Sequence, residues 1–130
     1  MLALLLALVA LPLRAADGLH VPTGQLVLPY EALWEDHAGE GVNGETWLVL
    51  RFLTPEIARG AGKFSYSDVL ADFDFVCENI GLPLIEISGG GVDLLIVTFL
   101  DKPLARGALD QKVTQFNNIY RVDQGGCALE

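Results

Sequence analysis

A run of apolar residues at helical spacing predicts one amphipathic helix in the middle of the chain. From Tyr66 to Ile80 the apolar side chains follow the i, i+3, i+4, i+7 rule without a break, so they form one face. Gly81 can supply a left-handed stop, and Pro83 opposes continuation of a regular helix. We expect the apolar face, which includes Cys77, to pack on a sheet.

Apolar runs separated by turn residues predict strands on both sides of this helix. Two of them, Thr46–Leu53 and Leu94–Leu100, are largely apolar on both faces, as expected of central strands. Asn43-Gly44 predicts a hairpin turn before the first run, and Gly89-Gly90-Gly91 predicts one before the second. In chain order, the expected strands are Tyr30–Asp36, Thr46–Leu53, Leu84–Ser88, Asp93–Leu100, Thr114–Val122 and Cys127–Glu130.

The first strand has a competing interpretation, a helix that begins at Pro29, because Tyr30, Leu33 and Trp34 also have helical spacing. With the strand interpretation, the elements follow the order β-β-α-β-β-β-β. We therefore predict an α+β fold, a mainly antiparallel β-sheet with one amphipathic helix packed on one face.

The first residues of the chain resemble an export signal. The apolar run Leu2–Leu13 is too short to cross a membrane, which takes about 20 residues. Small residues follow it, so we expect a signal peptide over residues 1–16, with cleavage after Ala15 or Ala16, and a single small domain over residues 17–130. No Lys or Arg precedes the run, which is unusual for such a signal. A buried N-terminal helix is the alternative, although it would lack any polar face.

The charge balance narrows the choice of partners. The formal net charge is −9, and removal of residues 1–16 takes away Arg14 and makes it −10. So acidic a surface repels phosphate, which argues against nucleic acid and anionic lipid as partners. We expect a periplasmic or secreted protein with no membrane span after cleavage, whose partner is an envelope protein or a small ligand.

Two cysteines, Cys77 and Cys127, are present. In an oxidising compartment an even pair favours a disulfide, which here would close a loop of about 50 residues. Two buried free thiols, or a reactive Cys77, are the alternatives.

Common catalytic and metal-binding patterns are missing from the sequence. His20 and His37 are its two histidines, and no Gly-x-Ser-x-Gly elbow accompanies them. The histidines and cysteines lack the spacing of metal ligands, so we predict no metal and no cofactor. Gly89-Gly90-Gly91 lies between two predicted strands, whereas a phosphate-binding loop precedes a helix. These absences favour a non-enzymatic protein.

Two groups of charged residues have both a structural and a functional interpretation. Asp68, Asp72, Asp74 and Glu78 form i, i+4 pairs on the predicted helix. A regular helix holds carboxylates too far apart for a calcium site, so an outward, solvated face is the preferred interpretation. Arg51 interrupts an apolar strand, where it needs a carboxylate partner or serves as a ligand anchor.

Several short segments together resemble an uncharacterised family of small secreted bacterial proteins, a domain of unknown function. They are Gly44-Glu45-Thr46-Trp47 followed by Arg51-Phe52, Cys77-Glu78, Asp101-x-Pro103, Thr114-Gln115-Phe116 and the final Cys127. Members of the family are sometimes labelled acetolactate synthase, which this sequence does not support, because a thiamine diphosphate enzyme needs a far larger chain. The resemblance carries no established activity, so it assigns no catalytic residue.

The sequence thus favours an exported envelope protein that acts as a binding or accessory module. The alternative is a small periplasmic enzyme or thiol protein that uses Cys77.

Overall fold

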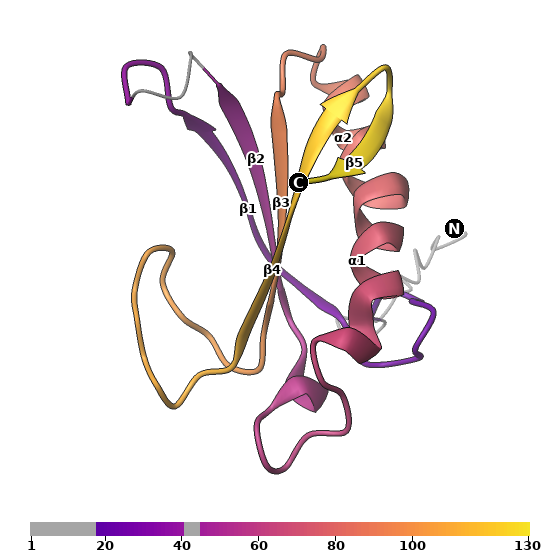
Figure 1. The fold of residues 1–130 in the computed structure, drawn as a ribbon, viewed down its shortest axis with the longest axis vertical. Helices are drawn as coiled ribbons and strands as arrows, with labels where there is room; N and C mark the ends of the chain where they lie inside the picture. The colour runs from indigo at the N-terminus through magenta and orange to yellow at the C-terminus, as the bar shows by residue number, and fades with distance from the viewer. Residues whose placement is uncertain (1–17, 41–44) are drawn as a thin grey trace, which may run out of the picture.

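A computed structural model describes residues 18–40 and 45–130. A five-stranded sheet lies beside one continuous helical segment (Figure 1). The strands are β1 (Leu28–Asp36), β2 (Thr46–Leu53), β3 (Leu94–Leu100), β4 (Gln115–Asp123) and β5 (Gly126–Leu129). They lie in the order β1-β2-β3-β4-β5, so β1 and β5 form the two edges. The expected signal peptide (residues 1–16) and the Asn43-Gly44 turn lie outside the described residues.

The predicted α+β class is confirmed, with one helical layer against a mostly antiparallel sheet. β2 and β3 are the parallel pair, while β1–β2, β3–β4 and β4–β5 are antiparallel. A parallel pair needs a crossover connection, which the helical segment between β2 and β3 supplies. This segment is long enough to return the chain to the start of the neighbouring strand. The β1 strand interpretation is confirmed over the helix alternative.

The helical segment is longer than predicted. It starts with a 3-10 turn (Ser67–Val69) and continues as α1 (Leu70–Val76), a π turn (Cys77–Gly81) and α2 (Leu82–Ile87). Within residues 18–40 and 45–130, no helix is long and apolar enough to cross a membrane.

Two predictions about the end of this helix are wrong. Leu84–Ser88, expected as a strand, belongs mostly to α2, so Gly89-Gly90-Gly91 connects a helix to β3 and is not a hairpin turn. Gly81 has a right-handed helical conformation (φ −67°, ψ −54°) and does not end the helix. Pro83 lies in the first turn of α2, directly after the π turn, where the missing N–H is tolerated best.

Gly81 is needed for close packing instead. A Cβ atom at this position would come within 2.1 Å of Leu95 Cδ1 on β3. The absent side chain therefore lets the π turn approach the sheet. The local preference of glycine for a helix stop is overridden by this contact.

The core lies between the helical segment and the sheet. Phe73 of α1 stacks on Phe99 of β3, with ring centroids 4.2 Å apart, and Phe99 also meets Phe52 edge-on at 6.1 Å. The side chains that fill this layer are fully or almost fully buried. They include Val27, Leu48, Leu50, Phe52, Val69, Phe73, Val76, Leu95, Val97 and Phe99.

A connection between β3 and β4 lies over the opposite side of the sheet. Two contacts hold this connection, residues 101–114, to the sheet. Arg51 of β2 donates to the backbone carbonyl of Leu104, and Arg106 Nε donates to Glu35 Oε2 of β1 at 3.0 Å. Because of this cover, Val49 and Ile96 of the sheet's second face are also buried.

Candidate functional site

The two cysteines form a disulfide between Cys77 and Cys127, so their predicted pairing is present in the structure. Their Cα atoms lie 6.4 Å apart, and the bridge links residues 50 positions apart in the sequence. Cys77 is fully buried in the π turn, while Cys127 lies on β5. A bridged and buried sulfur cannot act as a nucleophile, so this arrangement does not provide a reactive thiol.

Asp68, Asp74 and Glu78 are exposed on the helical segment, as the expected solvated face requires, but Asp72 is not. Asp72 is fully buried and holds the segment before β1. It accepts hydrogen bonds from the backbone N–H of Thr23 (2.9 Å), the hydroxyl of Thr23 (2.5 Å) and Gln25 Nε2 (2.8 Å). The expectation is wrong at Asp72 because its partners come from a segment 47–49 residues earlier in the chain.

A second acidic residue of the helix anchors β4. Tyr120 donates its hydroxyl proton to Asp74 Oδ1 at 2.6 Å, and Tyr66 donates to Asn118 Oδ1 at 2.5 Å. Asn118 Nδ2 lies 3.4 Å from Tyr120 Oη and joins the two bonds into one chain. Burial, together with the Asp74 carboxylate, raises the pKa of Tyr120 well above its ordinary value. These groups hold the helix against the sheet.

Arg51 has the carboxylate partner that its position requires. Its side chain is 2% exposed and forms an ion pair with Glu31, whose side chain is 34% exposed. The Arg51 guanidinium also lies over the ring of Tyr30, 5.3 Å from its centroid. With Glu31, Leu104 and Tyr30 around it, Arg51 is occupied by structural contacts and is not displayed to a ligand.

A bulge in β1 brings the ring of Tyr30 to Arg51. The register between β1 and β2 shifts between Pro29 and Glu31, so Tyr30 has no partner of its own on β2. In a regular strand Tyr30, Ala32 and Trp34 would share one face. The bulge separates Tyr30 from Ala32 and Trp34, and the Tyr30 ring stacks against Arg51 instead.

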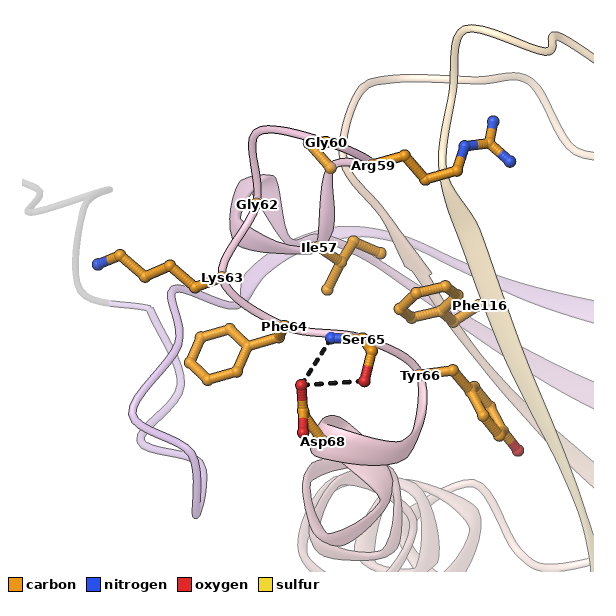
Figure 2. Close-up of a pocket in the computed structure, with 11 residues that line it drawn as sticks. Ile57, Arg59, Gly60, Gly62, Lys63, Phe64, Ser65, Tyr66, Asp68 and Phe116 are labelled. Atoms are coloured by element: carbon orange, nitrogen blue, oxygen red, sulfur yellow. Dashed lines mark hydrogen bonds between the residues drawn. The ribbon is translucent and has the colours of Figure 1, made fainter.

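An open depression lies beside the loop that precedes the helix (Figure 2). It has a volume of about 550 Å³ and is bordered by Ile57, Phe64, Tyr66 and Phe116. Ser65 donates its backbone N–H and its hydroxyl to Asp68 Oδ2, at 2.8 and 2.9 Å. These two bonds, the backbone bond first, hold the pKa of Asp68 below its ordinary value.

The cations at the border of this depression are engaged elsewhere. Figure 2 shows the side chains of Arg59 and Lys63 extending away from its centre on opposite sides. The Arg59 guanidinium donates to the carbonyl of Gln111 at 2.6 Å, and Lys63 Nζ lies 3.3 Å from Glu56 Oε1. The depression therefore offers an aromatic surface with the Asp68 carboxylate beside it, and neither bordering cation is directed into it.

A smaller and more apolar groove lies where β1 faces the helical segment. Its volume is about 260 Å³. Leu50 and Phe52 of β2 are buried beneath it, while Ala32 of β1 faces Ile80 and Leu84 of the helical segment across it. One aliphatic side chain fits a space of this size. The groove is adjacent to the unpaired edge of β1.

At the end of β1 lies an aromatic pair, His37 and Trp47, beside the charged side chains of Glu35, Glu40 and Arg106. His37 stacks on Trp47 with ring centroids 3.5 Å apart, and its two ring nitrogens contact Glu35 (2.9 Å) and Glu40 (2.6 Å). The Glu35 carboxylate, followed by Glu40, raises the pKa of His37 above its ordinary value. The hydrogen bond from Arg106, followed by that from His37, lowers the pKa of Glu35, although burial opposes this shift.

Most of the candidate residues predicted from the sequence therefore make structural contacts, and they do not come together in one site. The described residues contain no group of three His, Cys, Asp or Glu side chains positioned to hold a metal ion. His20 is exposed before β1 and has no ring contact to another ionisable group in the described part of the chain. Sequence reasoning missed the groove beside β1, because its walls come from four separate segments.

The fold is a small α+β domain in which one crossover helix is stapled to an edge strand by a disulfide. The chain belongs to the family of unknown function DUF6497, whose family model matches residues 5–130. The assignment confirms the resemblance to an uncharacterised family that the sequence indicated. No curated protein and no solved structure matches the chain.

Proposed function

We propose that this protein works outside the cytoplasm as a non-enzymatic binding or accessory module. One observation carries the proposal: the groups capable of chemistry are used in structural contacts, while an apolar groove beside a strand edge remains open. Cys77 is in a disulfide, Arg51 is paired with Glu31, and Asp72 holds the segment before β1.

The proposed location has two supports. A disulfide is stable in the periplasm or the medium and rare in the cytoplasm. The apolar run Leu2–Leu13 followed by Arg14-Ala15-Ala16 is typical of an export signal. The acidic surface favours neutral or basic partners and disfavours nucleic acid.

The alternative function, a thiol enzyme that uses Cys77, is disfavoured by the buried disulfide. Alkylation of the native protein distinguishes the two. We expect a thiol-reactive reagent to modify neither cysteine without reductant, whereas a catalytic thiol would react rapidly at neutral pH.

Native mass spectrometry of protein taken from the extracytoplasmic fraction, without reductant, tests the proposal. We expect a mass that corresponds to cleavage after Ala15 or Ala16 and is lighter by two hydrogens. A reproducible additional mass, retained after in-cell cross-linking, would identify a bound ligand or partner. An uncleaved protein with two free thiols would contradict the proposed location. The absence of any bound species after cross-linking would contradict the binding function.

A further inference from the structure

We propose that the outer edge of β1 binds an extended segment of another protein as an additional strand, and that apolar and basic residues alternate in this segment. The inference rests on the proposed binding function and names the partner's chemistry and its place on the molecule. Three properties of the β1 edge carry it: its backbone groups, the groove beside it and its charge.

The backbone of β1 presents a row of donors and acceptors that point away from β2. His37 donates its N–H to the carbonyl of Glu45 at 3.0 Å, so the backbone N–H of His37 points toward the neighbouring strand, as in a hydrogen-bonded pair of an antiparallel ladder. In an antiparallel ladder such pairs alternate with pairs whose backbone groups point outward. By this alternation, the N–H and C=O groups of Ala32, Trp34 and Asp36 point to the outer edge.

The neighbouring strand confirms the phase of this alternation. Thr46, which is opposite Asp36, donates its N–H to Asp93 Oδ2, and its carbonyl accepts from the N–H of Asp93. Both groups of Thr46 therefore point away from β1. No residue in the described ranges forms a hydrogen bond with the backbone N–H or C=O of Ala32 or Trp34 at the outer edge. An extended polypeptide is the ligand that matches such a row.

The apolar groove lies on the same edge, on the side of the sheet that carries the helix. The side chains of Ala32 and Trp34 are on this side, because they are opposite Leu50 and Leu48 of the core. Ala32 borders the groove, and Trp34, which is 48% exposed, lies two residues further along the strand. A strand added to β1 would place one apolar side chain in the groove and the next but one against Trp34.

On the other side of the edge, the overall negative charge of the chain favours basic residues. Glu31 and Glu35 point to the face opposite the helix, since they are opposite Arg51 and Trp47. Glu31 pairs with Arg51, and Glu35 pairs with Arg106 and His37, whereas Asp36 lies on the helix side of the edge, two residues beyond Trp34. The net charge of the chain is −9, so basic side chains of an added strand are attracted to this face. The partner's residues alternate accordingly, apolar toward the helix and basic toward the opposite face.

A second copy of the chain does not fit this edge. Each copy has a net charge of −9, and pairing two β1 strands would bring their Glu31 and Glu35 side chains into one row. The proposed occupant is therefore a different protein.

A synthetic peptide of about ten residues with alternating lysine and valine is the probe. Hydrogen exchange followed by NMR gives the most direct readout, because strand addition protects one set of amides and not the other. We expect the amides of Ala32, Trp34 and Asp36 to exchange at least about tenfold more slowly with the peptide bound. The amides of Leu33 and Glu35 already bond to β2, so their exchange rates should change little.

Two variants separate the contribution of the β1 backbone to peptide binding from that of the Trp34 side chain. Ala32→Pro removes an outward N–H without removing a bond to β2, so we expect about a tenfold increase in the Kd for the peptide and little loss of stability. Trp34→Ala should weaken binding severalfold through lost apolar contact. Leu109→Ala, which truncates a 98% exposed apolar residue elsewhere, is the matched control and should leave the Kd unchanged.

Peptides of alternating glutamate and valine, or lysine and glycine, test the two requirements separately. Both should bind at least about tenfold more weakly than the lysine–valine peptide. Binding that leaves the three β1 amides unprotected and maps to Phe64 and Phe116 would overturn the strand-addition inference, while the binding function would stand. Failure of the lysine–valine peptide to bind would also overturn it. Failure of the proposed function itself is the separate result that cross-linking in the cell recovers no bound species.

Discussion

The two edges of the sheet are built in opposite ways. β5 has four residues and is tied to the helical segment by the Cys77–Cys127 disulfide, while Glu130 after it pairs with Arg121 on β4 (Figure 1). β1 has nine residues, exposes Trp34 and has an apolar groove beside it. A long open edge is an aggregation hazard that proteins ordinarily blunt. The contrast is consistent with the binding role that we propose for β1 and with a stabilising role for the disulfide at β5.

Several side-chain contacts hold the open edge and the segment before it in place. The Arg51–Glu31 pair and the Arg106–Glu35 pair lie behind β1, and Asp72 holds the segment from Thr23 to Gln25 that precedes it. An edge that is rigid before binding loses little conformational entropy when a partner strand is added. We therefore expect that mutations can change the stability provided at β5 and the strand binding proposed at β1 separately.

The largest expected effect comes from removing the staple at β5. The double variant Cys77→Ala/Cys127→Ala frees a loop of 50 residues, which costs up to about 4 kcal/mol in the free energy of unfolding in the chain-entropy model. Denaturant unfolding of the double variant and of the oxidised protein measures the difference. The amides of β5 should lose protection from hydrogen exchange before those of β1. Equal loss at both edges would contradict the separation of roles.

The next effect comes from the ion pair behind β1. Glu31→Ala leaves the 2%-exposed Arg51 without its carboxylate, and we expect a loss of about 2–3 kcal/mol. Arg51→Met removes the buried charge and leaves Glu31, which is 34% exposed and can be hydrated, so its cost should be about 1 kcal/mol. Chemical denaturation of both variants compares them. A larger loss in Arg51→Met would show that the arginine stabilises mainly through its contact with Leu104.

A smaller loss is expected at the anchor of the segment before β1. Asp72→Asn keeps the size of the side chain but removes the charge that three donors share, at a cost of about 1–2 kcal/mol. Leu19, which borders the groove, should become more mobile, while β5 is unaffected. Methyl relaxation of Leu19 by NMR is the measurement. Asp68→Asn, on the same helical segment, is the control, and an equal response there would contradict the assignment.

Periodicity and turn chemistry were sufficient to predict most of the elements. Thr46–Leu53 was predicted with the observed bounds, and the pairing of Cys77 with Cys127 followed from the expected oxidising compartment and the even number of cysteines. Both depend on features that are local in the sequence or few in number. The apolar face of the helix was visible for the same reason, because its repeat does not depend on distant residues.

The errors arose where a distant contact overrides a local signal. Gly81 and Pro83 are strong helix stops, yet packing of Gly81 against Leu95 carries the helix through them. The i, i+4 spacing of Asp68 and Asp72 indicated a solvated face, but the partners of Asp72 precede it by nearly 50 residues. The groove beside β1 could not be predicted at all, because no single segment forms it.

The smallest effect concerns the pH dependence of His37 at the end of β1. Both ring nitrogens contact carboxylates, and both can donate only when the imidazole is protonated, so Glu35 and then Glu40 raise its pKa above 6.5. The stabilisation from this group is fully present below about pH 6.5, the unfolded value, and is lost as the pH rises through the higher folded pKa. The lowered pKa of Glu35 sets the opposite limit, because its stabilisation is present above about pH 4.5 and is lost as the pH falls through the folded value.

An NMR titration of the His37 ring measures this directly. Glu35→Gln should lower the pKa of His37 more than Glu40→Gln, because the Glu35 hydrogen bond is the larger cause of the shift. A pKa at or below 6.5 in the unmodified protein would show that the two carboxylates do not hold the ring as described. Since His37 stacks on Trp47 at the same end of β1, loss of its proton should loosen this end of the open edge and leave the stapled edge unchanged. The pH at which the Kd for an added strand begins to rise should therefore follow the pKa of His37 in each variant.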